Sequence, residues 1–153
     1  MRWLERKVPP PLLAVAIAAL MWAAAGYPPA LTIAPLLRDI AVAALALSGA
    51  AIDLLAMATF LKRRTAINPF QPAKASTLVT SGVYRFTRNP MYVGLLLLLS
   101  AWAIWLSAWW PLAGPVFFFL YVNRFQIEPE EKILKVVFGP AYLKYLQEVR
   151  RWL

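Results

Sequence analysis

Long apolar runs separated by short polar or basic segments are the dominant pattern of this chain. They occupy residues 12–27, 40–61, 91–107 and 110–123. A helix needs about 20 apolar residues to cross a bilayer, and lengths from about 17 are workable. The second run has full length, and the shorter runs approach this range with their flanks. The pattern therefore predicts an all-α integral membrane protein with four transmembrane helices, forming a single domain over residues 1–153.

The flanks of the first run and the turn between the third and fourth runs refine this prediction. The first run lies between prolines at positions 9–11 and the pair Pro28–Pro29, and its basic front also resembles a signal peptide cleaved near residues 23–25. We favour a first membrane helix, because further apolar runs follow it. The turn between the third and fourth runs, residues 107–111, is short and uncharged, which predicts an antiparallel hairpin.

Basic residues predict the orientation in the membrane. Three of them lie in the first seven positions, six lie between residues 62 and 88 with no acidic residue, and others follow from Arg124 onward. The opposite turns carry only Arg38 with Asp39. Four spans place the basic regions on one side, so both termini are expected in the cytoplasm. The net charge of +9 then faces anionic lipid headgroups, and nucleic acid is not an expected partner.

The C-terminal part, residues 124–153, changes to an amphipathic helical pattern. Pro129 suits the first turn of a helix, and Gly139–Pro140 separates two helical segments. Apolar residues recur at helical spacing on both sides of that break: Ile133, Leu134, Val137, Tyr142, Tyr145, Leu146 and Val149. We expect this tail on the cytoplasmic face, covering the hairpin.

Composition narrows the chemistry. The chain is 61% hydrophobic and 15% charged, outside the range of soluble domains. It has no cysteine and no histidine, which removes disulfides, the usual general base and the commonest metal ligands, so no metal site is predicted. Its six glycines never lie within two residues of each other, which excludes a glycine-rich nucleotide loop. A cofactor pocket would have to be built from helix ends and side chains.

The first candidate cluster is the segment 82–94, GVYRFTRNPMYVG. Pro90 is expected to begin a helix there, leaving the backbone donors of Met91, Tyr92 and Val93 to receive a carboxylate with help from the arginines. In a second interpretation the arginines only set the membrane orientation, Asn89 caps the helix and the tyrosines mark the interface. Composition alone favours this second interpretation.

A second cluster contains Asn123, Arg124, Glu128, Glu130 and Glu131. Its carboxylates could bind an amino group or ribose hydroxyls, or orient a substrate. Alternatively, the two adjacent glutamates serve the positive end of a helix, and the second pairs with Lys135 one turn later. The residue types alone leave both open.

Asp53 is a carboxylate in the middle of the second run. Such residues are costly in a membrane and often functional, but Asp53 could also pair with a basic residue or a backbone group of a neighbouring helix.

Together, the two clusters resemble the superfamily of isoprenylcysteine carboxyl methyltransferases and phospholipid methyltransferases, which are integral membrane enzymes. The family pattern reads G-x-Y-x-x-x-R-H-P-x-Y-x-G and, after a hydrophobic hairpin, E-E-x-x-L-x-x-x-F-G-x-x-Y-x-x-Y-x-x-x-V. The matching residues are Gly82, Tyr84, Arg88, Pro90, Tyr92, Gly94, Glu130, Glu131, Leu134, Phe138, Gly139, Tyr142, Tyr145 and Val149. Asn89 stands where many members have histidine, so it retains hydrogen bonding but cannot titrate.

The resemblance implies S-adenosylmethionine as the methyl donor, enclosed by the hairpin and the tail. It assigns Tyr84, Arg88, Asn89, Pro90, Met91, Tyr92 and Gly94 to the cofactor site, and Glu130 and Glu131 to contacts with its polar groups. Glu130 and Glu131 are also candidate catalytic residues, as is Arg124 on the acceptor side.

The predicted function is S-adenosylmethionine-dependent methyl transfer to a lipophilic acceptor at the cytoplasmic membrane face. A prenylcysteine-type carboxylate or a phospholipid amine fits as the acceptor. Displacement at a sulfonium asks mainly for alignment and desolvation, so the absence of histidine and cysteine is no obstacle. The alternative is a non-catalytic lipid-binding or assembly subunit that retains the fold.

Overall fold

In the computed structural model, which describes residues 5, 7–63 and 78–153, all regular structure is helical. The elements are α1 (Pro10–Ala24), α2 (Pro35–Arg63), η3 (Gly82–Arg85), α3 (Pro90–Leu106), η4 (Trp110–Leu112), α4 (Ala113–Val122), η5 (Asn123–Ile127) and α5 (Glu128–Glu148). Here η3 and η4 are short 3₁₀ helices and η5 is π-helical. The prediction of an all-α fold is confirmed. Most of the basic segment between the second and third apolar runs falls outside the described residues.

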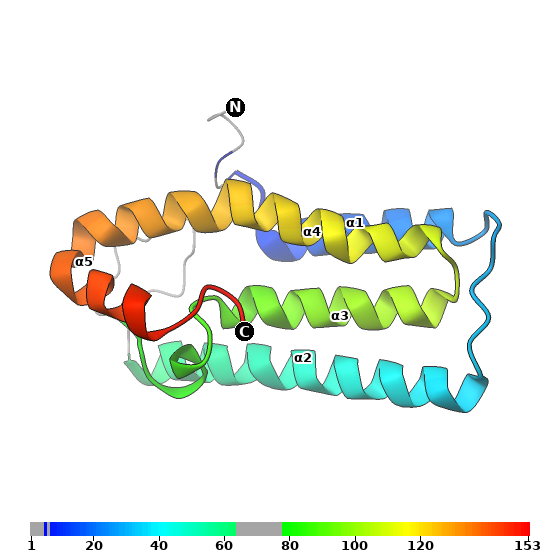
Figure 1. The fold of residues 1–153 in the computed structure, drawn as a ribbon, viewed down its shortest axis with the longest axis horizontal. Helices are drawn as coiled ribbons and strands as arrows, with labels where there is room; N and C mark the ends of the chain where they lie inside the picture. Colours follow the sequence, from blue (N-terminus) through cyan, green and yellow to red (C-terminus); the bar gives the residue numbers. More distant parts are fainter. Residues whose placement is uncertain (1–4, 6, 64–77) are drawn as a thin grey trace.

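Helices α1 to α4 lie side by side along the long axis of the molecule, with α3 in the centre (Figure 1). Helix α3 packs against α1, α2 and α4, and α1 also packs against α4. The short turn between α3 and α4 makes them neighbours, so the predicted antiparallel hairpin is confirmed. This arrangement places the start of α3, α5 and the C-terminus toward the same end of the molecule (Figure 1).

Prolines begin three of the five α-helices of the described residues, at Pro10, Pro35 and Pro90. Proline suits the first helical turn because its fixed φ matches the helix and its missing N–H would have no partner there. At the other end of the bundle, α3 stops at Ser107, whose φ of 49° is left-handed. The Ser107 carbonyl accepts a hydrogen bond of 2.8 Å from the Leu31 N–H, so the loops at this end are joined.

Helix α4 does not end where the predicted tail begins. It continues through η5 into α5, and this long helix extends beyond the start of α3 (Figure 1). Pro129 lies in the first turn of α5 as expected, but α5 follows η5 directly, without an intervening loop. Pro129 has no N–H to donate and its ring would strike the carbonyl of Phe125 in a regular α-helix, so the preceding turn widens into the π-helical η5.

The predicted break at Gly139–Pro140 is confirmed. Gly139 has φ 49° and ψ −124°, a conformation that side chains disfavour, and α5 changes direction there. The second half of α5 turns back, and the C-terminus lies beside the start of α3 (Figure 1). The tail is helical as expected, in two segments separated at Gly139, and it folds over one end of the bundle.

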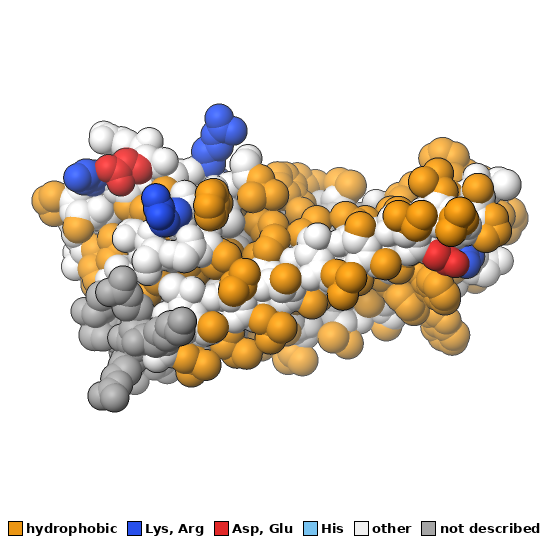
Figure 2. All heavy atoms as spheres, turned by 90° about the horizontal axis from the view of Figure 1, so that it is seen from below, with side chains coloured by type: hydrophobic (Ala, Val, Ile, Leu, Met, Phe, Trp, Pro, Cys, Tyr) orange, Lys and Arg blue, Asp and Glu red, His pale blue; other side chains and the backbone are white. Residues whose placement is uncertain are grey.

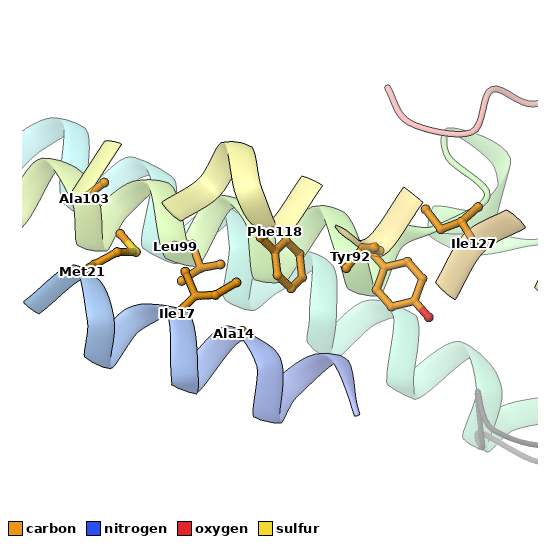
Figure 3. Packing of buried hydrophobic residues seen from close by; sticks show 9 residues of the cluster. Ala14, Ile17, Met21, Tyr92, Leu99, Ala103, Phe118 and Ile127 are labelled. Atoms are coloured by element: carbon orange, nitrogen blue, oxygen red, sulfur yellow. The ribbon is translucent and has the colours of Figure 1, made fainter. Parts of the chain in front are cut away.

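The apolar core lies between α1, α3 and α4. Phe118 of α4 is fully buried and belongs to one core cluster with Ile17 and Met21 of α1 and Leu99 of α3 (Figure 3). Gly114 allows α4 to approach α1 closely, because a Cβ there would overlap the side chain of Met21. This core fixes the hairpin against α1 and so positions the end of the bundle that carries the polar clusters.

The outer surface of α2 is apolar. Residues Pro35–Thr59 have a mean hydropathy of 2.1 and only 11% of the most apolar window is buried, so this helix is long and apolar enough to cross a membrane. Helices α1 and α3 are apolar but shorter. Hydrophobic side chains cover most of the face that includes α2, and charged side chains gather toward its two ends (Figure 2). A continuous apolar surface of this kind suits contact with lipid.

Two neighbouring phenylalanines of α4 provide a test of this packing. Phe118→Ala is expected to destabilise the protein by about 3 to 5 kcal/mol, because it leaves a cavity in the core. Phe117→Ala removes a side chain that is 55% exposed and should change stability by about 0.5 kcal/mol or less. Thermal unfolding of both variants in detergent measures the difference, and equal Tm shifts would contradict the described core.

Candidate active site

The C-terminal segment lies along the residues that lead into α3. The Thr87 hydroxyl and the Asn89 side-chain amide both donate to the carbonyl of Arg151, at 3.1 and 2.9 Å. The Arg88 N–H donates to the carbonyl of Arg150 at 3.0 Å. The start of α3 and the end of the chain therefore form one structural unit.

Glu131 joins this unit to α5. One carboxylate oxygen lies 3.0 Å from the Arg88 guanidinium and 3.1 Å from Nε of Arg151, and the other lies 2.7 Å from Nη2 of Arg151. Glu131 is only 9% exposed. The hydrogen bonds that Arg151 donates to Glu131 raise the pKa of Arg151. One buried anion thus holds two cations that lie far apart in the sequence.

Glu130 makes a separate contact. Its carboxylate accepts a hydrogen bond of 2.7 Å from the hydroxyl of Tyr92, which lies in the first turn of α3 and is buried. Adjacent residues on a helix point in directions about 100° apart, so Glu130 and Glu131 reach different groups. The structure therefore brings the two predicted clusters together through two contacts, Tyr92 with Glu130 and Arg88 with Glu131.

Buried tyrosines form the wall beside these contacts. The Tyr145 hydroxyl donates to the carbonyl of Tyr84 at 2.7 Å, and the rings of Tyr142 and Tyr145 lie 6.1 Å apart. Burial raises the pKa of Tyr84 and Tyr145 above the ordinary value, and burial with the nearby Glu131 raises the pKa of Tyr142 to about 12. At neutral pH these phenols stay protonated and can donate hydrogen bonds.

Gly94 lies one turn into α3 and leaves room for Asp53 of α2. A Cβ at this position would overlap the Asp53 carboxylate. Met91 packs with Ala56 and Tyr84, which ties α2, η3 and α3 together at the same level. Pro90, at the start of α3, is fully buried.

Two expectations about the start of α3 are wrong. The Asn89 side chain does not cap the helix, because it donates to the C-terminal segment instead. The N–H groups of Tyr92 and Val93 both donate to the carbonyl of Asn89, at 3.0 and 3.1 Å, so they are not available to a ligand. The suggested pairing of Glu131 with Lys135 is replaced by the two arginine contacts.

Arg124 lies apart from these contacts. It is half-exposed on η5, 3.0 Å from Glu128 and 3.9 Å from Glu5, with its guanidinium 5.9 Å from the Phe125 ring centre. Asn123 accepts a hydrogen bond of 3.1 Å from the indole of Trp152. The second sequence cluster is therefore divided: Glu130 and Glu131 face the start of α3, and Arg124 with Glu128 forms a surface pair.

Comparison with known proteins identifies the family. The family model described as phospholipid methyltransferase matches residues 37–141, more than half of the chain. This chain belongs to the phospholipid methyltransferase family. The predicted resemblance is confirmed, and membership supports methyltransferase activity and membrane association. A protein of Haemophilus influenzae, described only as uncharacterized, is 48% identical over 63 residues, which are 41% of this chain and 100% of that relative. No solved structure matches the chain.

The contact between Arg151 and Glu131 was not predicted from the sequence of this phospholipid methyltransferase family member. Arg151 and Trp152 lie beyond the family match and outside the motif pattern, yet Arg151 supplies the bidentate partner of Glu131. The only signal was the basic pair Arg150–Arg151 before a tryptophan, which any membrane-facing tail can have. The folded tail is what gives Arg151 its place.

The residues present fit a polar, charged cofactor. Nε of Arg88 is buried and has no hydrogen-bond partner within the described parts of the chain. A buried donor of this kind is costly unless an acceptor meets it. In a methyltransferase of this family, a carboxylate of a bound ligand would supply that acceptor.

Glu131 and Glu128 form a matched pair for mutagenesis, three residues apart on α5. Glu131→Gln should destabilise the protein by about 3 to 5 kcal/mol, because it leaves two guanidinium groups partly buried without their anion. Glu128→Gln should cost at most about 1 kcal/mol, because its pair with Arg124 is exposed.

Thermal unfolding and trypsin cleavage at Arg150 and Arg151 measure both effects. Release of the C-terminal segment should make Glu131→Gln the faster-cleaved variant. Equal cleavage of Glu131→Gln and Glu128→Gln would mean that Glu131 does not hold this segment.

Proposed function

We propose that this protein is an S-adenosylmethionine-dependent methyltransferase that acts on a lipophilic acceptor at the cytoplasmic face of a membrane. The observation that carries the proposal is the meeting of the two sequence clusters: Arg88 contacts Glu131 and Tyr92 contacts Glu130, at 3.0 and 2.7 Å. The chain brings together, from α3 and α5, the residue types that the family resemblance assigns to one cofactor site.

The proposed arrangement in the membrane has four spans. Helices α1 to α4 lie side by side along the long axis, and the start of α3, α5 and the C-terminus lie toward the same end (Figure 1). The opposite end carries exposed tryptophans such as Trp105, Trp109 and Trp110, which suit a membrane interface. With the basic regions on the cytoplasmic side, the candidate site opens to the cytosol, where the methyl donor is available.

The cofactor would be held mainly by the start of α3 and by α5. Arg88 offers a buried donor to a carboxylate, and Glu130 offers an acceptor to an amino or hydroxyl group. Tyr84, Asn89, Pro90, Met91 and Gly94 form the surrounding wall in this proposal. S-adenosylmethionine would supply a methyl group activated by its sulfonium, so the protein's task is to bind, align and exclude water.

The two glutamates would have different roles. Glu131 is held in place by two guanidinium groups, so it suits an orienting role. Glu130 has a phenol as its partner and is the better candidate to take a proton from an acceptor. In this proposal Arg124, which is half-exposed on η5, would meet the headgroup of an acceptor, either a prenylcysteine-type carboxylate or a phospholipid.

Binding of labelled S-adenosylmethionine to the detergent-solubilised protein tests this proposal. Arg88→Ala and Tyr92→Phe should each weaken binding about tenfold or more, since each removes a buried polar partner. Arg85→Ala is the matched control, because Arg85 is an exposed arginine three residues away and should leave binding unchanged. Wild-type protein that does not bind the donor would favour the non-catalytic lipid-binding alternative.

A further inference from the structure

Asp53 is the one charged residue in the interior of the apolar helical runs. Within residues 35–59 of α2 the other charges, Arg38 and Asp39, lie at the far end, and the sequences of α1 and α3 contain none. A carboxylate in such a helix is costly, because no water is present to solvate it. The proposed methyl transfer does not use Asp53, so its presence needs another reason.

The surroundings of Asp53 are specific. Its carboxylate fits against Gly94 of α3, where any Cβ would overlap it, so the α2–α3 contact has a notch at this position. Gly49, one turn earlier on α2, approaches the carbonyl of Gly94 in the same way. The small residues bring the two helices together and leave space for one carboxylate between them.

Oδ1 of Asp53 is buried, and no described residue gives it a hydrogen bond. The two arginines of the candidate active site, Arg88 and Arg151, both form ion pairs with Glu131. Burying a carboxylate oxygen without a partner is strongly unfavourable, and native proteins keep few such atoms. A cationic ligand would satisfy it.

Asp53 borders the candidate active site. Ala56, one turn later on α2, packs against Tyr84, and Gly94 is two residues from Tyr92. The pKa of Tyr84 is raised first by burial and then by the charges of Tyr145, Glu130 and Asp53, so both carboxylates act on the same phenol. A group held by Asp53 would therefore lie on the membrane side of the residues proposed to bind the methyl donor.

An apolar groove lies further along the same two helices. It has a volume of about 320 Å³ and is lined by Val42, Ala46, Leu98, Ala101, Trp102 and Trp105. Ala46 lies seven residues before Asp53 on α2, and Leu98 lies four residues after Gly94 on α3, roughly 6 to 10 Å away along the helices. Its volume is that of a small-ligand site, and its lining suits a hydrocarbon chain.

We propose that Asp53 binds the cationic nitrogen of a lipid amine acceptor whose hydrocarbon chain lies in this groove. The inference rests on the proposed function and narrows it: a carboxylate at this position attracts an ammonium group and repels a carboxylate of the prenylcysteine type. Asp53 is then a specificity residue that contacts the acceptor. The acceptor nitrogen lies between Asp53, on the α2 side, and Glu130, on the α5 side.

Direct binding in the absence of the methyl donor tests the role of Asp53. The probes are a long-chain primary amine and a long-chain alcohol of the same length, each with a photoactivatable diazirine in the chain. Wild-type protein in nanodiscs should crosslink the amine about tenfold more than the alcohol, with the label in the peptides of α2 and α3. Asp53→Asn should lose this preference and keep the labelling by the alcohol.

Two further variants complete the test. Asp39→Asn, at the far end of α2, should keep the amine preference, because Asp39 is exposed and pairs with Arg38. Gly94→Ala fills the notch and displaces the Asp53 carboxylate, so it should reduce amine labelling without a change of charge. A thermal unfolding measurement shows whether each variant remains folded.

The outcomes separate this inference from the proposed function. An amine preference that persists in Asp53→Asn, or a wild-type protein that labels equally with both probes, overturns the role of Asp53 even if the donor binds. A wild-type protein that needs Asp53 for amine binding but does not bind S-adenosylmethionine supports the amine site and refutes the methyltransferase.

Discussion

The ion pair of Glu131 with two arginines is the interaction on which the arrangement of α5, the start of α3 and the C-terminal segment depends. Glu131 comes from α5, Arg88 from the segment before α3 and Arg151 from the end of the chain. These groups are largely buried, so the charges attract one another strongly and are costly to separate. The bent tail can therefore close over the bundle only where this anion meets both cations.

Backbone features of the tail deliver Glu131 to that position. Pro129 widens the helix into the π-helical turn η5 and changes the direction in which the next residues face. Gly139 then adopts a conformation that returns the chain toward α3. With the helix continuous from α4 to α5, the hairpin core around Phe118 is mechanically joined to the polar cluster, and the packing of the membrane part sets the geometry of the site.

The candidate site has a cationic side and an anionic side. Arg88 and Arg151 share Glu131, whereas Glu130 has a phenol and Asp53 has no described partner for one of its oxygens. The cationic side suits the carboxylate of a cofactor, and the anionic side suits a positively charged group. The proposed binding of a sulfonium donor together with a lipid acceptor would require both a cationic and an anionic side.

The helix positions, the hairpin and the family could be predicted from the amino-acid sequence. Apolar runs determine where helices form, prolines and Gly139 determine where they begin or bend, and the short turn makes the hairpin, because these are local effects of hydrophobicity and backbone restriction. The spacing of the 82–94 and 130–131 motifs determined the family. The partners of the charged residues in these motifs lie far away in the sequence and could not be predicted in this way.

Only the tertiary structure decided that Glu131 pairs with Arg151 instead of Lys135, that Asn89 holds the C-terminal segment instead of capping α3, and that Arg124 lies apart on the surface. Charged side chains have many possible partners along a sequence. The choice among them depends on which groups the packed helices bring together away from water, because there an unpaired charge is most costly.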